Sequence, residues 1–236
     1  MYRMDIQLIP SKERGCTRLP WLDSRHSFSF GHYYEPRRMG FGALRVINED
    51  VVAPGKGFAP HPHANMEIVT LVLAGQLAHR DTLGNLATIG AHEVQRMSAG
   101  SGIEHSEFNP STTQPVHFLQ IWLHPLHADQ TPAYAQRAFA PEACEGRWQQ
   151  VVSPDGEGDS LSIDQDARIF LTRLSAGSDL THVLSGQRRA FVQVIQGQAQ
   201  LGEVSLHTGD GAAIQGDGVL MLHAESDTQA VLFDLA

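Results

Sequence analysis

Cysteine, clustered basic residues and long apolar runs are all scarce in this sequence. Its 236 residues include only Cys16 and Cys144, which lie far apart and form no CxxC motif. Two lone cysteines argue against a disulfide framework and favour reduced thiols in a cytosolic protein. The N-terminal segment has no secretory apolar core, and no run approaches the ~18 apolar residues of a membrane span. We therefore expect a soluble, cytoplasmic protein that makes no contact with a membrane.

Positive charge is also in short supply. The chain has 17 Lys and Arg residues against 26 Asp and Glu residues, which gives a formal net charge of −9. Its nearest basic runs, Arg37-Arg38 and Arg188-Arg189, are too short to neutralise a phosphate backbone, because that needs clustered Lys and Arg. This balance argues against direct binding of nucleic acid.

Short β-type segments are what the chain has in quantity. Hydrophobic residues make up 42% of it, enough for a substantial core in one large β domain or two of ordinary size. Runs rich in Val, Ile, Leu and Phe occupy residues 43–47, 67–73, 93–97, 116–123, 169–174, 190–195, 219–222 and 230–235. Turn residues separate these runs, and no long 3.6-residue apolar period is present. The pattern predicts an all-β sandwich or barrel with little helix.

The strand rhythm is interrupted once. Proline and small or polar residues dominate from about 125 to 160, which predicts a connecting segment over 128–160 with a short strand or helical piece near 148–152. The second half then resembles the first, since 67–76 can be laid over 190–198, and 103–106 over 221–224. Such a repeat predicts two related barrels, over 1–127 and 161–236. The alternative, that any two β domains look this similar, stays open at this point.

Two short patches carry candidate metal ligands, His61-Pro62-His63 and His105-Ser106-Glu107. Side chains at i and i+2 of a strand project to the same side. Two such strands facing one another would therefore offer three imidazoles and one carboxylate to a single point. That ligand set suits a transition metal, and an ion that favours six-coordination, such as Fe(II), Mn(II) or Ni(II), would keep two positions open for a substrate. Zinc would be coordinatively closed by four protein ligands.

Glu67 is a rival carboxylate. It lies four residues after His63, so in an unbroken strand it would share that residue's face. We favour Glu107 as the ligand because its i+2 relation to His105 needs no help from loops. Glu67 could instead accept a hydrogen bond that orients a histidine.

The spacing around the two patches resembles the cupin superfamily. The first cupin motif is matched by Gly55, His61, His63, Glu67 and Gly75, and the end of the second by Gly102, His105 and Asn109. Ser98-Ala-Gly-Ser-Gly102 stands where a cupin proline is expected, and this turn followed by His105-Ser-Glu107 is the pattern of the pirin family. Residues 21–36 and 40–47 also resemble pirin-like proteins. The similarity covers the whole chain and is closest to the bacterial group described as quercetin 2,3-dioxygenases.

This resemblance implies a bicupin of two jelly-roll barrels with metal in the N-terminal barrel only. Its ligands would be His61, His63, His105 and Glu107. The family metal is usually iron, so Fe²⁺ is the expected ion, with Zn²⁺, Ni²⁺, Mn²⁺, Co²⁺ or Cu²⁺ as alternatives. The implied activity is oxygen-dependent opening of a flavonol ring such as that of quercetin, a small aromatic, oxygen-rich substrate. Glu107, or Glu67 from outside the ligand set, is the candidate base for the substrate hydroxyl.

Other readings remain open. Some pirins are linked to transcription machinery, so the chain could instead be a non-catalytic metal- or redox-sensing regulator that binds a protein partner. The natural substrate could also be an oxygen-rich compound other than a flavonol. We expect a monomer, because the repeat already buries one barrel against another.

The remaining histidines and several aromatic residues have no partner pattern. A surface or core role is expected for ten histidines: His26, His32, His79, His92, His117, His124, His127, His182, His207 and His223. The repeat puts His223 where a ligand of the second barrel would lie. Phe28, Phe30, Tyr33 and Tyr34 could line a pocket for an aromatic substrate, but aromatic side chains of β proteins usually pack in cores, and that role is expected for them.

Overall fold

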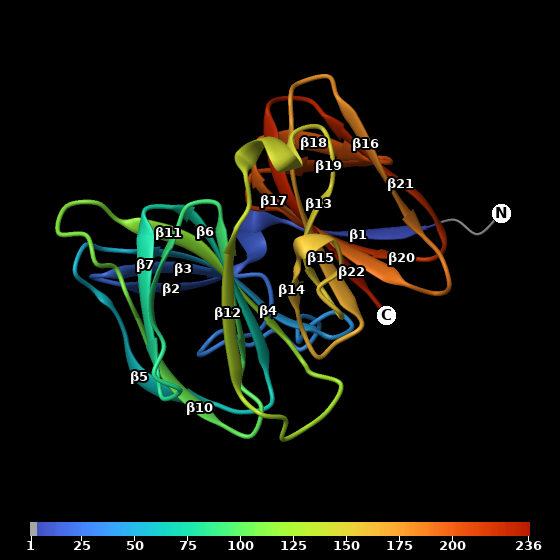
Figure 1. The fold of residues 1–236 in the computed structure, drawn as a ribbon. Helices are drawn as coiled ribbons and strands as arrows, with labels where there is room; N and C mark the ends of the chain where they lie inside the picture. The colour runs from blue at the N-terminus through green and yellow to red at the C-terminus, as the bar shows by residue number, and fades with distance from the viewer. Residues whose placement is uncertain (1–3) are drawn as a thin grey trace. The chain divides into compact units, whose positions relative to one another are not determined.

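The computed structural model describes residues 4–236, which form 22 strands and three short 3₁₀ segments. They divide into two compact units, drawn in Figure 1. The N-terminal unit comprises Gly15–Phe139 and Ile163–Gln165, and the C-terminal unit comprises the described residues up to Arg14, Ala140–Ser162 and Asp166–Ala236. The predicted all-β class with little helix is confirmed. Within residues 4–236 no helix is long and apolar enough to cross a membrane.

The N-terminal unit contains a seven-stranded sheet of order β12-β9-β6-β11-β4-β3-β2 and a four-stranded sheet of order β5-β10-β7-β8. The seven strands are β2 (Gly15–Leu19), β3 (Leu22–His26), β4 (Leu44–Val52), β6 (Glu67–Ala74), β9 (Glu93–Ser98), β11 (Val116–Leu123) and β12 (Ala133–Ala138). The four are β5 (Gly57–His63), β7 (Gln76–Asp81), β8 (Leu86–Gly90) and β10 (Ile103–Phe108).

The C-terminal unit repeats this arrangement with sheets of order β1-β20-β17-β22-β15-β13-β14 and β16-β21-β18-β19. Its larger sheet consists of β1 (Asp5–Ile9), β13 (Gln149–Ser153), β14 (Leu161–Ser162), β15 (Ala167–Leu174), β17 (Arg189–Gln196), β20 (Gly211–Gln215) and β22 (Thr228–Leu235). Its smaller sheet consists of β16 (Asp179–Leu184), β18 (Gln198–Leu201), β19 (Val204–His207) and β21 (Gly218–Ala224). The 3₁₀ segments are Ser11–Glu13, Pro141–Cys144 and Glu157–Asp159.

The sequence repeat corresponds to one hairpin in each unit. Residues 67–76 form β6 and enter β7, and residues 190–198 run from β17 into β18. Gly75 and Gly197 turn the chain with φ values of 79° and 97°. A Cβ would lie 2.7 Å from the Pro115 carbonyl oxygen at Gly75 and 2.3 Å from that of Asp227 at Gly197. Both positions require glycine, which explains why this part of the repeat can still be recognised in the sequence.

The boundaries of the two units differ from the predicted 1–127, 128–160 and 161–236. Strand β1 pairs with β20, so the N-terminal strand belongs to the C-terminal unit. Within the predicted connecting segment, β12 pairs with β9 of the N-terminal unit, while β13, the piece expected near 148–152, pairs with β15 of the C-terminal unit. Each sheet therefore takes strands that are distant in sequence. A run of alternating residues identifies a strand but not the sheet that it joins.

A row of polar side chains crosses the interior of the N-terminal unit. Gln95, Thr70, Gln120, Asn48 and His26 lie opposite one another on β9, β6, β11, β4 and β3. All five are buried, and we call them the polar row.

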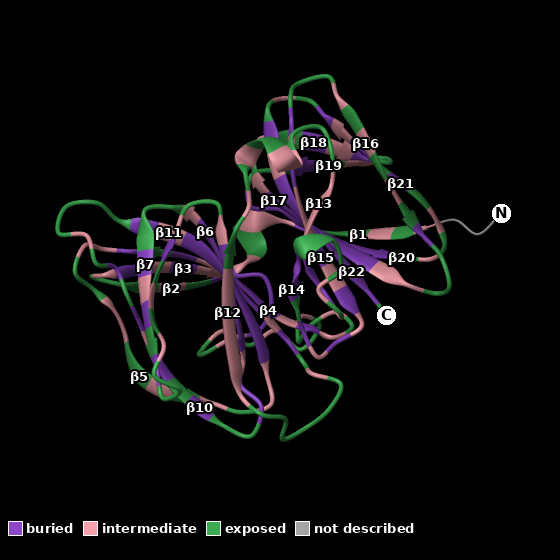
Figure 2. Cartoon of the chain, in the orientation of Figure 1, coloured by how far each residue is buried: buried purple, intermediate pink, exposed green. Residues whose placement is uncertain are grey.

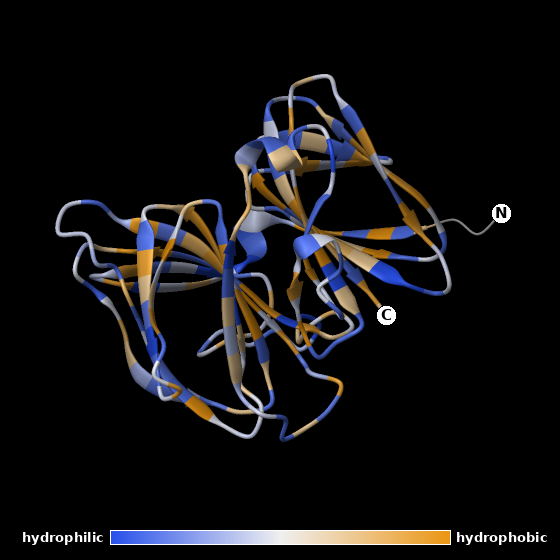
Figure 3. Cartoon of the chain, viewed as in Figure 1, coloured by the Kyte–Doolittle hydropathy of each residue, from blue (hydrophilic) through white to orange (hydrophobic). Residues whose placement is uncertain are grey.

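The polar row separates two apolar clusters. Figures 2 and 3 show the burial and hydropathy of the strands that carry them, which are largely buried and rich in hydrophobic residues. One cluster contains Val72, Val116 and Phe118, and the other contains Ile68 and Met97 with Trp122 packed against it. Along β6, Thr70 lies between Ile68 and Val72; along β11, Gln120 lies between Phe118 and Trp122. Burying a layer of polar groups costs free energy unless they are hydrogen-bonded. The hydrogen-bond partners of the polar row therefore show which residues it holds in place.

Candidate metal centre

Neighbouring strands β5 and β10 position the histidines that the sequence singled out. His105 lies directly opposite His61, and Ile103 lies opposite His63. The register shifts between His105 and Glu107, since Glu107 lies opposite Phe58, so β5 carries one extra residue here, as in a β-bulge. The strands approach closely at Gly57, where a Cβ would lie 2.1 Å from the Glu107 carbonyl oxygen.

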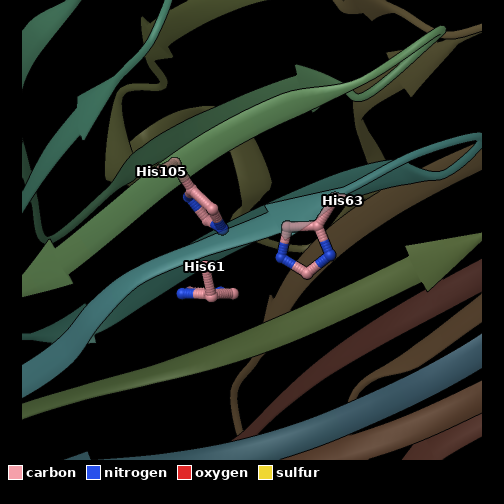
Figure 4. Close-up of side chains that lie close together, drawn as sticks. All are labelled: His61, His63 and His105. Carbon is pink, nitrogen blue, oxygen red and sulfur yellow. The ribbon is translucent and has the colours of Figure 1, made fainter.

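The three imidazoles of His61, His63 and His105 converge (Figure 4). Their ring centroids are 4.8 Å apart for His61 and His63, 4.5 Å for His61 and His105, and 4.9 Å for His63 and His105. One nitrogen from each ring lies within 4.8 Å of the others. The expected convergence of these three rings is therefore present.

The protonation of His63 and His105 suits metal binding. Burial, followed by the nearby imidazoles, lowers the pKa of His105 to about 3, and burial with His61 lowers that of His63 to about 4. Both rings are therefore neutral at pH 7, the form that binds a metal. His61 Nδ1 donates a hydrogen bond of 2.8 Å to the Ala59 carbonyl oxygen, which leaves Nε2 with its lone pair.

Unpartnered polar atoms provide a test of whether a metal fits here. His105 is 2% exposed, and both of its ring nitrogens are buried without a hydrogen-bond partner. Such orphaned atoms are rare in folded proteins and call for an explanation, of which a bound ion is one. The donor set of imidazole nitrogens and a carboxylate is one that divalent transition metals accept. The residues present therefore fit a metal ion.

Glu107 lies at the same centre but on the side of His79. It is 2% exposed, its Oε2 accepts a 2.9 Å hydrogen bond from Gln120 Nε2, and its Oε1 is buried without a partner. Burial, only partly offset by Gln120, raises its pKa to about 7. The ligand atoms of Glu107, His79 and His105 form a second group within 4.8 Å. His105 thus belongs to two overlapping groups, one with His61 and His63 and one with Glu107 and His79.

His79 is the residue at this centre that sequence reasoning missed. Its ring is buried on β7, opposite Glu107. Nε2 donates to Asp81 Oδ2 at 3.0 Å, and Nδ1 accepts from Gln95 Nε2 of the polar row at 3.1 Å. Both nitrogens are thereby engaged, so His79 packs beside His105 as a fixed neighbour. The i, i+2 pattern His79-x-Asp81, the same spacing as the two patches, was the available signal.

Glu67 lies outside both groups of potential ligands in the described chain. Its carboxylate Oε2 accepts a 2.7 Å hydrogen bond from the Ser98 hydroxyl, and burial raises its pKa. Glu67 also lies opposite Ser98 in the pairing of β6 with β9. Its side-chain hydrogen bond is therefore made with the first residue of the small-residue turn before β10, and not with a histidine.

A cavity of about 100 Å³ opens beside the centre in the N-terminal unit. Its apolar walls are Leu22, Phe30, Phe58 and Trp122. His61 and Glu107 line it from the metal side, and Asp50 and three members of the polar row, Gln120, Asn48 and His26, line it from the larger sheet. Of the aromatic residues expected in the core, Phe28 is buried at 2% exposure, Tyr34 is 72% exposed, and Phe30 lines this cavity.

Comparison with known proteins agrees with this architecture. The family model described as Pirin matches residues 10–123, and the model described as Quercetinase C-terminal cupin domain matches residues 150–235. An Escherichia coli protein named quercetin 2,3-dioxygenase is 45% identical over 230 residues, which cover 98% of each chain. The chain belongs to the pirin family. A pirin-like protein from Caulobacter vibrioides is 39% identical and covers 92% of this chain and 93% of its own.

A solved structure shows that a similar pirin takes up a divalent metal. The crystal structure of the bacterial pirin YhhW from Escherichia coli in complex with nickel(II) superposes with a TM-score of 0.93. It is 44% identical to this pirin and covers 98% of this chain and 99% of its own.

The C-terminal unit of this pirin differs at the positions that face its interior. Strand β10 buries Ile103, His105 and Glu107, whereas β21 buries Leu220, Leu222 and Ala224. His223, which the repeat set over His105, falls on the other face of β21 and contacts Asp179. The sequence alignment of 103–106 with 221–224 was therefore wrong in register. An odd-numbered slip along a strand moves every side chain to the opposite face.

Proposed function

We propose that this pirin is a metal-dependent dioxygenase that opens the heterocyclic ring of flavonols such as quercetin. The observation that carries the proposal is the pair of buried, unpartnered ligand groups, His105 and Glu107 Oε1, beside a cavity with aromatic walls. The names of the relatives, quercetin 2,3-dioxygenase among them, support the same substrate class.

The proposed metal ligands are His61, His63, His105 and Glu107. Fe²⁺ is the proposed ion, and the nickel complex of the Escherichia coli relative supports a divalent metal in general. When bound, such an ion supplies Lewis acidity toward a substrate hydroxyl and redox activation of dioxygen. The neutral rings of His63 and His105 are ready to accept it at pH 7.

Glu107 is the proposed proton acceptor. In the metal-free protein burial raises the pKa of Glu107 to about 7, and a bound cation would lower it, so that the carboxylate is available to accept a proton. Gln120 fixes Oε2, while Oε1 is buried without a hydrogen-bond partner. Glu67 was the alternative base, and its bond to Ser98, outside both ligand groups, favours Glu107.

The surrounding residues keep the site in shape. Gln95 and Asp81 hold the His79 ring beside His105, and Thr70 donates a 2.6 Å hydrogen bond that orients Gln120. Phe30, Phe58 and Trp122 present apolar surface that excludes water from a bound aromatic ring.

Turnover of quercetin by reloaded protein tests this function. The protein is stripped with a chelator, reloaded separately with Fe²⁺ and Ni²⁺, and supplied with quercetin. Oxygen uptake, loss of the quercetin absorbance and release of carbon monoxide are then measured. We expect all three with wild type, none with His105→Ala, and wild-type values with His223→Ala, which removes a histidine from the other unit. Reloaded wild type that neither consumes oxygen nor bleaches quercetin would contradict the proposal.

A further inference from the structure

The cavity has a further buried carboxyl besides Glu107. Asp50 on β4 is 4% exposed, lines the cavity, and has its Oδ1 buried without a hydrogen-bond partner. It lies opposite Ser24 of β3 in the larger sheet. A buried carboxyl oxygen without a partner costs free energy, so a carboxyl of this kind in the wall of a cavity marks a place where a ligand can supply the missing bond.

The neighbours of Asp50 are held in place and have little freedom to satisfy it. His26 Nδ1 donates to Asn48 Oδ1 at 2.7 Å, and its Nε2 accepts from the Thr17 hydroxyl at 2.8 Å. Ser24 forms a hydrogen bond with Asp50 that partly offsets the effect of burial, which raises the Asp50 pKa to about 7. The carboxyl can therefore act as acceptor or donor near neutral pH, while its Oδ1 has no hydrogen-bond partner.

The size and walls of the cavity indicate what completes the bond. An apolar cavity of ~150 Å³ holds a benzene ring in another protein, and the cavity of about 100 Å³ here has walls of Leu22, Phe30, Phe58 and Trp122. Its space therefore admits at most one six-membered ring and not a whole flavonol. His61 and Glu107 also line it, so a ring in the cavity adjoins the metal centre.

We propose that this cavity recognises one hydroxylated aromatic ring of the substrate, and that Asp50 Oδ1 accepts a hydrogen bond from a phenolic hydroxyl on that ring. The inference rests on the proposed function and deepens it, because it selects flavonols by the outer phenyl ring next to the reacting centre. A site built to bind a hydroxyl discriminates strongly against analogues that lack it.

Binding without turnover tests this recognition. Metal-loaded protein is titrated in the absence of dioxygen, and quenching of tryptophan fluorescence is followed, since Trp122 lines the cavity. The ligands are kaempferol, with one hydroxyl on its outer ring; kaempferide, its methyl ether; and galangin, with no outer-ring hydroxyl. We expect wild type to bind kaempferol on the order of 10-fold more tightly than galangin or kaempferide. Asp50→Leu should lower the affinity for kaempferol to that for galangin and leave galangin within about two-fold.

Glu49→Gln is the matched control, because Glu49 adjoins Asp50 on β4 but contacts His117 on the other face. It should keep the preference for kaempferol. Equal affinity of wild type for the three flavonols, or equal losses for kaempferol and galangin in Asp50→Leu, would overturn the proposal. If Asp50→Leu does not fold, the wild-type comparison of kaempferol with kaempferide still decides, because the methyl ether has no proton to donate. Absence of turnover in air with the preference intact would contradict the dioxygenase function alone.

Discussion

Replacing Glu107 should make the metal-free protein more stable while destroying its metal site. Burial raises the pKa of Glu107 from 4.5 to about 7. Between these pH values the folded protein keeps a proton that the unfolded chain has lost. The free energy of unfolding therefore falls as the pH rises through this window. Glu107→Gln removes the titrating group and with it this loss.

The size of the effect follows from the pKa. Each pH unit between 4.5 and about 7 is worth about 1.4 kcal/mol, so the wild type loses about 3 kcal/mol to Glu107 by pH 8. Near pH 4.5 the protonated carboxyl and the amide make similar bonds to Gln120, and the two proteins should match. His63 and His105, whose pKa values are lowered, act in the opposite direction below pH 6.5. They are present in both proteins and cancel in the difference.

Urea unfolding of chelator-treated protein at pH 4.5 and pH 8 measures this difference. Tryptophan fluorescence is a suitable signal, since Trp21 and Trp122 both lie in the N-terminal unit. Glu104→Gln is the control, because Glu104 is exposed on the other face of the same strand. With metal added, only the wild type and the control should gain stability. A Glu107→Gln protein that is less stable than wild type at pH 8 without metal would refute the reasoning.

Three further predictions concern the metal affinity. Because Glu107 must lose its proton to bind an ion, affinity measured against a competing chelator should rise about 10-fold per pH unit below 7 and level off above it. Gln120→Leu removes the hydrogen bond that lowers the Glu107 pKa, so the levelling point should move to higher pH; an unchanged profile would contradict this role. Gly57→Ala must push β5 from β10, since its Cβ would lie 2.1 Å from the Glu107 carbonyl oxygen, and should lower affinity by at least about 10-fold. Gly90→Ala, whose Cβ meets nothing closer than 3.4 Å, is its control and should match wild type.

The sequence predicted local features of this molecule better than its long-range ones. Two-residue spacing predicted that His61 and His63 share one face of a strand, because the alternation of side chains is built into every strand. Their convergence with His105 followed from the resemblance to the pirin family. The spacing did not predict that Glu107 would group with His79, since that depends on β7 pairing with β10 and on the extra residue in β5. The polar row was not predicted either, because its members come from five strands whose pairing the sequence does not show.

Comparison of the two units shows how much folding stability the candidate site gives up. They share a strand order, yet where β10 buries His105 and Glu107, β21 buries Leu220 and Leu222 within an apolar core. A fully buried leucine contributes roughly 1.5–3 kcal/mol, whereas a buried carboxyl that must ionise costs about as much at pH 8. The N-terminal unit therefore gives up several kcal/mol that its counterpart keeps, on the same fold. A bound ion would restore this lost stability. The gain in the free energy of unfolding on adding metal should therefore be confined to the N-terminal unit. Hydrogen exchange of β10 and β21, measured with and without the ion, tests this expectation. Protection should rise in β10 alone. An equal rise in β21 would mean that the stabilities of the two interiors are not independent.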